Sequence, residues 1–103
     1  MATNDLITVG ALPIVYLQHI AVAGGDWFED EERARDLITG QVNACARDQV
    51  SWGGGETPGL SGIIVPGTVL LRGAAFGFIG SKKHLINPAR IKAGDHIILV
   101  GSS

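Results

Sequence analysis

Two short motifs place an acidic residue beside residue types that bind phosphate or metal ions. Asn4-Asp5 precedes an apolar stretch, and the run Gly53-Gly54-Gly55-Glu56-Thr57 follows the short apolar segment 50–52. Glycine lets backbone N–H groups approach an anion without steric cost. Magnesium on a phosphate keeps several waters and takes one or two carboxylates. Asp5 and Glu56 are therefore candidate metal ligands if the fold brings them together, and the glycine run is a candidate phosphate-binding segment.

Taken alone, these motifs also have simpler interpretations. A glutamate in a glycine-rich turn is more often a solvated charge, and Asn4-Asp5 is more often a helix cap. The sequence contains neither the G-x-x-x-x-G-K-[ST] phosphate loop nor the G-x-G-x-x-G dinucleotide motif. His19 lies in an apolar run, which favours a packed core histidine. Cys45 is expected to be a small buried hydrophobe on a helix.

The first half of the chain predicts two helices around one strand. Asn4 or Asp5 would cap a short helix over 6–11, which Pro13 prevents from continuing. The β-branched and aromatic run 14–22 predicts a buried strand, with an amphipathic helix as the alternative. A capping box at Asp26 and apolar residues at three- and four-residue spacing predict a helix over 28–49. Gly40 within this helix suggests close packing against a sheet.

The second half predicts strands. We expect a short strand over 50–52 that ends in the glycine run, a long strand over 68–79 and a last buried strand over 96–100. The predicted fold is an α/β (α+β) single domain over 1–103, with a mixed sheet of about four strands and helices on one face.

Composition narrows the class of protein further. The chain has 103 residues, of which 46% are hydrophobic and only 17% charged, with 15 glycines, which excludes a disordered chain. A net charge of −2 argues against nucleic acid as a partner. The single cysteine excludes an intrachain disulfide framework. The longest apolar stretch is too short for a membrane span and no targeting segment is evident, so we expect a cytoplasmic protein. The excess of apolar residues predicts a partner, most simply a second copy.

Several motifs occur in the order of one known family. They are Asn4-Asp5, Gly10-Ala11-Leu12-Pro13, Gly54-Gly55-Glu56-Thr57 and the run Ile-Lys-Ala-Gly-Asp at 91–95. With them the chain resembles, over essentially all its length, part of the N-terminal domain of AIR synthase (phosphoribosylformylglycinamidine cyclo-ligase) and the AIR synthase-related proteins. The family's glycine-rich segment with a lysine and its His-x-Asn-Gly motif are not matched in these 103 residues.

The resemblance implies an ATP- and magnesium-dependent enzyme of purine biosynthesis that activates an amide oxygen by phosphorylation and acts on a small phosphorylated substrate. It also implies a homodimer formed through the sheets. The implied cofactor-binding residues are Asn4, Asp5, Gly53, Gly54, Gly55, Glu56 and Thr57, with Asp5 and Glu56 as the metal ligands. Because of the unmatched motifs, we expect a truncated domain without turnover alone, which a second polypeptide would complete. The alternative is a non-catalytic homodimerising module that kept the fold.

Overall fold

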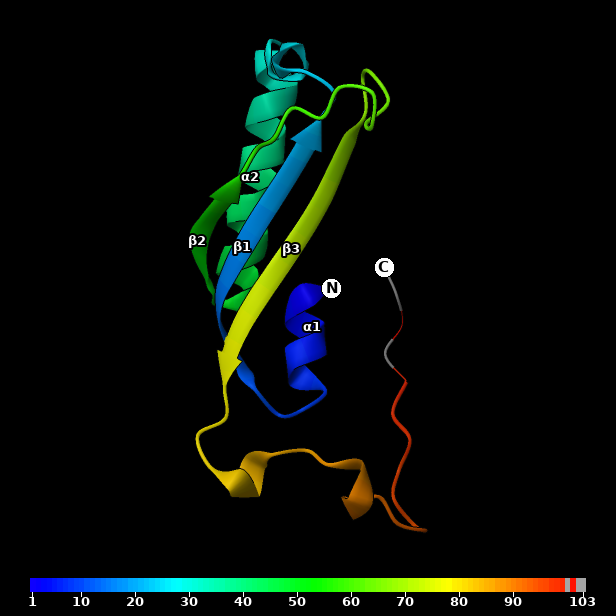
Figure 1. Ribbon diagram of the computed structural model, residues 1–103. Coiled ribbons are helices and arrows are strands. Elements are labelled where there is room, and N and C mark those ends of the chain that lie inside the picture. The colour runs from blue at the N-terminus through cyan, green and yellow to red at the C-terminus, as the bar shows by residue number, and fades with distance from the viewer. Residues whose placement is uncertain (100, 102–103) are drawn as a thin grey trace.

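A computed structural model describes residues 1–99 and 101 and consists of one mixed sheet with helices against it (Figure 1). In chain order the main elements are helix α1 (Ala2–Ile7), strand β1 (Leu12–Val22), a 3-10 turn (Gly25–Phe28), helix α2 (Glu31–Asp48), strand β2 (Ser51–Glu56) and strand β3 (Val69–Phe78). Short 3-10 turns at Lys82–His84 and Pro88–Arg90 follow β3. The α/β class predicted from the sequence is confirmed.

Among the described residues the sheet has three strands, in the order β2-β1-β3, where about four were predicted. Strand β1 is central, pairs with β2 in parallel and pairs with β3 antiparallel. His19 of β1 is level with two residues at once, because its Cα partners are Glu56 on β2 and Arg72 on β3. The sheet is therefore mixed, as predicted, and its register aligns three polar residues across all three strands.

Both α-helices lie on the same face of the sheet. Figure 1 shows α2 behind the strands, with α1 beside the lower end of β3. Thr3 of α1 donates a 2.7 Å hydrogen bond from its hydroxyl to Oδ2 of Asp48, at the C-terminal end of α2. We call the opposite side of the sheet the open face. Because side chains alternate along a strand and directly opposed residues share a side, it carries Val15, Leu17, His19, Leu70, Arg72, Ala74 and Phe76.

Helix α1 begins earlier than the sequence predicts. The prediction that Asn4 or Asp5 caps a helix over 6–11 is wrong, because both residues lie inside α1. Their backbone N–H groups donate to the carbonyl of Met1, at 2.9 and 3.3 Å, so the first turn forms around Met1. The helix ends at Ile7 with Thr8 as its C-cap, and Gly10, with a φ of +78°, turns the chain into β1.

Helix α2 is close to its prediction over 28–49 but begins later. Residues Gly25–Phe28 form a 3-10 turn, and the N-cap is Asp30, whose side chain accepts a 3.0 Å hydrogen bond from the N–H of Arg33. Gln49, with a φ of +55°, ends the helix in the left-handed region. Gly40 has open space around it, so the prediction that it marks close packing against the sheet is wrong.

Two of the predicted strands are confirmed within one or two residues, and two need correction. Strand β2 continues through the glycine run to Glu56, where a loop was expected. The predicted last strand is not found: residues 96–99 have no regular structure, and Ile97 and Leu99 are each 90% exposed. Figure 1 shows this stretch running apart from the sheet, so no strand lies beside it to pair with. Val100 lies outside the described residues.

The chain buries little apolar surface on its own. The buried apolar side chains are Ala11, Ile20, Ala21, Val22, Trp27, Cys45 and Val50. The accessible surface is 8038 Å², whereas a compact chain of 10.8 kDa exposes about 5,500 Å². The radius of gyration is 17.7 Å, against about 13 Å for a compact domain of this length. The fold thus leaves about 2,500 Å² more surface exposed than a self-sufficient domain would.

Candidate functional site

The structure places the two predicted metal ligands in different hollows. Asp5 is exposed on α1 and lines a hollow of about 470 Å³ between α1, α2 and the sheet. Glu56 is exposed at the end of β2 and lines a hollow of about 550 Å³ above β1. None of the hollows found among the described residues contains both carboxylates. A site that uses both is therefore not preformed within a single chain.

The other predicted cofactor-binding residues divide between these two regions. Asn4 is exposed beside Asp5 on α1, and Thr57 is exposed directly after Glu56. Within residues 1–99 and 101, no group of three or more His, Cys, Asp or Glu side chains is placed to hold a metal ion. In the same part of the chain, no helix is long and apolar enough to cross a membrane.

The glycine run is part of strand β2, and its three glycines have different surroundings. A Cβ added to Gly55 would lie 1.7 Å from the carbonyl oxygen of Gln18, so Gly55 permits the close approach of β2 to β1. A Cβ on Gly53 would meet the side chains of Val15 and Leu17. Gly54 has a φ of +116° and open space around it. Of the three, Gly54 alone has open space where a Cβ would lie.

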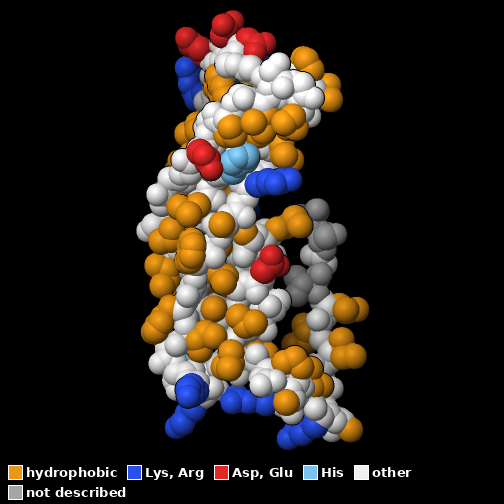
Figure 2. Space-filling model, viewed as in Figure 1, with side chains coloured by type: hydrophobic (Ala, Val, Ile, Leu, Met, Phe, Trp, Pro, Cys, Tyr) orange, Lys and Arg blue, Asp and Glu red, His pale blue; other side chains and the backbone are white. Residues whose placement is uncertain are grey.

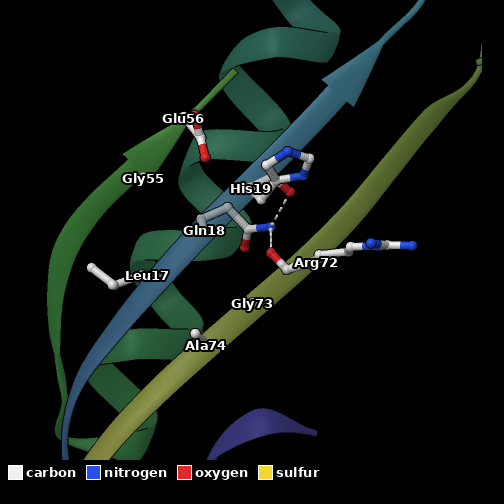
Figure 3. Close-up of a pocket in the computed structure, with 8 residues that line it drawn as sticks. All are labelled: Leu17, Gln18, His19, Gly55, Glu56, Arg72, Gly73 and Ala74. Carbon is white, nitrogen blue, oxygen red and sulfur yellow. Dashed lines mark hydrogen bonds between the residues drawn. The ribbon is translucent and has the colours of Figure 1, made fainter. Parts of the chain in front are cut away.

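A row of three polar side chains crosses the open face. Glu56 of β2, His19 of β1 and Arg72 of β3 line the same hollow, together with the apolar side chains of Leu17 and Ala74 (Figure 3). Figure 2 shows an acidic, a histidine and a basic side chain next to one another over the sheet, in a surface that is otherwise mainly hydrophobic or uncharged. A negative and a positive charge thus stand on either side of an imidazole.

Hydrogen bonds on the face of the sheet that the helices cover hold the strands together beneath this row. Gln18 is buried, and its Nε2 donates to the carbonyl oxygens of Arg72, at 2.7 Å, and His19, at 3.1 Å (Figure 3). Its Oε1 accepts a 2.7 Å hydrogen bond from the hydroxyl of Tyr16. Burial, and secondarily the nearby Cys45, raises the pKa of Tyr16, so this hydroxyl keeps its proton. The amide of Gln18 therefore fixes the position of β3, and with it Arg72, against β1.

The polar side-chain atoms of the row have no hydrogen-bond partners within the described residues. Nδ1 of His19 is buried and has no hydrogen-bond partner there, although the residue as a whole is half-buried and not enclosed in the core. The ion pair found in this part of the chain joins Arg33 to Asp30 on α2 and involves neither Glu56 nor Arg72. The row can therefore receive a group from outside the chain.

Sequence reasoning identified Glu56 but missed its link to His19 and Arg72. One signal was available, because Arg72 is the single charged residue in the predicted strand 68–79. A single charged residue in an apolar strand is a candidate functional residue, but whether it lies at the level of Glu56 depends on the strand register. That register comes from tertiary pairing and cannot be counted along the chain.

The fold and the row define a class: a small α/β domain whose mixed sheet is covered by helices on one face and carries a charged row on the other. Comparison with known proteins adds a more specific likeness. The chain is similar over all 103 residues to phosphoribosylformylglycinamidine cyclo-ligases, with 36% identity to that of Carboxydothermus hydrogenoformans, 34% to that of Clostridium perfringens and 33% to that of Lactobacillus acidophilus.

This likeness confirms the resemblance to AIR synthase that the sequence motifs indicated. It extends over a limited part of the relatives, since the chain spans 29% of the length of the first two proteins and 28% of the third. The chain matches no protein-family model.

Proposed function

We propose that this chain acts as a homodimerising α/β module that pairs with a second copy through its open face. The observation that carries the proposal is the large apolar area on that face. Phe76 is 61% exposed and Leu70 is 37% exposed, although both lie on a regular strand where a partner sheet could cover them. Soluble proteins rarely leave contiguous apolar patches of this kind uncovered unless they bind something.

The amount of exposed surface agrees with this proposal. A stable interface of ordinary size covers about 800 Å² on each partner. The chain exposes about 2,500 Å² more than a compact domain of its mass, so one such interface accounts for about a third of the excess. Two sheets that pack face to face interleave their side chains in a layer about 10 Å thick, which would give the open face the apolar core that a single chain lacks.

Light scattering coupled to size exclusion tests this proposal directly. We expect a mass of twice 10.8 kDa at micromolar concentration, and we expect Phe76→Ser to weaken the dimer. The matched control is Val42→Ser, which removes an apolar side chain that is 50% exposed on α2, away from the open face. A wild-type mass of one chain throughout the micromolar range would contradict the proposal.

A second function is favoured by the Gly-Gly-Glu-Thr motif and by the relatives. In it, the chain forms part of an ATP- and magnesium-dependent cyclo-ligase of purine biosynthesis and contributes part of a phosphate site. Phosphoryl transfer depends mainly on positioning and on neutralising charge. Glu56 and Asp5 would each offer a carboxylate to magnesium, and the N–H groups near Gly54 would approach a phosphate. Because the two carboxylates line separate hollows, we expect no turnover from these 103 residues alone and propose that a second polypeptide completes the site.

Calorimetric titration with ATP and Mg²⁺ tests this second function. A dissociation constant near or below about 100 µM, equivalent to about −5.5 kcal/mol, would support a nucleotide site if both Asp5→Asn and Glu56→Gln weaken it. Asp36→Asn, an exposed carboxylate on α2, is the control. If the folded wild-type chain gives no binding, the nucleotide site does not exist in these residues.

A cytoplasmic location belongs to the same proposal, and the free thiol of Cys45 is compatible with a reducing compartment.

A further inference from the structure

We propose that two copies pair about a two-fold axis that runs parallel to β1 and passes over His19, so that Glu56 of each copy forms an ion pair with Arg72 of the partner subunit. This inference rests on the proposed pairing through the open face. It adds the direction of the axis, the register of the two sheets and the residues that specify them.

The two charges of one chain lie at the same level along the strands. Glu56 and Arg72 are both Cα partners of His19, so the three residues stand at one height along the strands. Strand β1 lies between β2 and β3. The open face therefore carries a negative charge on one side of β1 and a positive charge at the same height on the other side.

The direction of the two-fold axis determines which charges meet across the interface. A two-fold axis parallel to the strands, between two sheets packed face to face, places β2 of one copy over β3 of the other and keeps every residue at its own height. Glu56 then faces Arg72 of the partner subunit, twice in each dimer, because such an interface is isologous. A two-fold axis in the same plane but perpendicular to the strands would place β2 over β2, and would oppose like charges.

Both the reach of the side chains and the cost of desolvating them favour this register. Aligned sheets pack about 10 Å apart at an angle of about 30°, a gap that long Glu and Arg side chains can bridge from opposite sides. Neither charge belongs to an ion pair in the part of the chain that the structure describes. Covering both with an apolar surface would carry a desolvation penalty. A second copy in this register covers the apolar side chains and supplies a counter-charge to Glu56 and to Arg72.

Charge reversal tests the register. Arg72→Glu and Glu56→Arg should each weaken the homodimer by about 100-fold or more, because each dimer then contains two like-charge contacts. An equimolar mixture of the two variants should associate to within about tenfold of the wild type, since every contact in the mixed dimer is again between opposite charges. The double variant E56R/R72E should restore the homodimer. Sedimentation equilibrium gives the constants, and native mass spectrometry identifies the mixed dimer.

Controls separate this inference from the proposed pairing. Asp36→Arg and Arg35→Glu make the same charge changes at exposed positions of α2, on the opposite face, and should leave the dimer unchanged. Far-UV circular dichroism checks folding, and Glu56→Gln with Arg72→Gln provide milder variants. If the wild type is a dimer but the single reversals leave it intact, or mixing restores nothing, the register is wrong and the pairing stands. A monomeric wild type would overturn both.

Discussion

Replacing single glycines of strand β2 with alanine should separate two roles of the Gly-Gly-Glu-Thr motif. Gly54 and Gly55 are adjacent and both have positive φ, at +116° and +152°. They differ in their surroundings, because a Cβ on Gly54 would meet nothing within 4 Å, whereas a Cβ on Gly55 would lie 1.7 Å from the carbonyl oxygen of Gln18. Gly54→Ala therefore measures backbone strain alone, and Gly55→Ala adds a collision with β1.

The expected magnitudes follow from these contacts. A non-glycine residue held in a sparsely populated backbone region costs about 1–3 kcal/mol, and we assign this cost to both variants. In Gly55→Ala the strands must also separate locally, which disrupts the pairs Gln18↔Gly55 and His19↔Glu56. With about 0.5–1.5 kcal/mol net for each backbone hydrogen bond, this adds about 1–3 kcal/mol. Small domains have only about 5–15 kcal/mol of unfolding free energy in total, so the difference between the two variants should be easy to measure.

Urea unfolding at fixed protein concentration is the suitable assay, because the proposed pairing would make the stability depend on protein concentration. Circular dichroism follows the whole fold, and tryptophan fluorescence includes Trp52 on β2, whose indole N–H donates a 3.1 Å hydrogen bond to the carbonyl of Gly54. Gly40→Ala on α2 is the control, since Gly40 also has open space but a helical backbone. It should be neutral or stabilising, by up to about 1 kcal/mol.

Equal losses in Gly54→Ala and Gly55→Ala would refute the reasoning, because the collision with Gln18 would then contribute nothing. A larger loss in Gly54→Ala would refute it more strongly. If Gly55→Ala does not fold at all, Gly55→Ala combined with Gln18→Ala offers no rescue, because the contact is with backbone atoms. Urea titrations from zero, with the same stabilising osmolyte present for every variant, would then compare their free energies of unfolding.

Two further predictions concern the hydrogen bonds that position the elements. Tyr16→Phe should cost about 1–3 kcal/mol, because it leaves Oε1 of the buried Gln18 without its donor. Burial, with Cys45 second, raises the pKa of Tyr16 in the folded state. The stability from this group is therefore full below about pH 10 and is lost as the pH rises further. Urea titrations across that range should show a loss of unfolding free energy that Tyr16→Phe lacks. Asp30→Ala should cost about 1 kcal/mol in the same assay, because it removes the N-cap hydrogen bond from the N–H of Arg33.

Local sequence patterns were enough to predict the elements that pack against each other. The β-branched run of β1 and the apolar spacing of α2 each show the periodicity of their element. That periodicity depends only on which face of the element each residue lies on. Boundaries were less well predicted, because more than one residue could cap each helix. Asp26 and Asp30 both offer a carboxylate ahead of α2, and the 3-10 turn over Gly25–Phe28 gave the position to Asp30.

Features that depend on distant pairing could not be predicted in this way. The glycine run was expected to be a loop, since three glycines in succession disfavour a strand, but pairing with β1 makes it part of β2. The apolar stretch 96–99 has the composition of a buried strand, yet a strand forms only where another lies alongside it, and none does in the described residues. The same limit concealed the position of Arg72 opposite His19, which is set by the pairing of β3 with β1.

The glycine motif shows why likeness to a family and local geometry answer different questions here. The resemblance to AIR synthase includes the motif Gly-Gly-Glu-Thr, and it implies glycines that admit a phosphate. In this chain Gly55 is required by the close approach of β2 to β1, and Glu56 lines the same hollow as Arg72. A motif can therefore be retained for strand packing and charge placement alone. The two roles separate at Gly54, which has open space around it: a phosphate site predicts that Gly54→Ala impairs nucleotide binding beyond its effect on stability, and a packing role predicts that it does not.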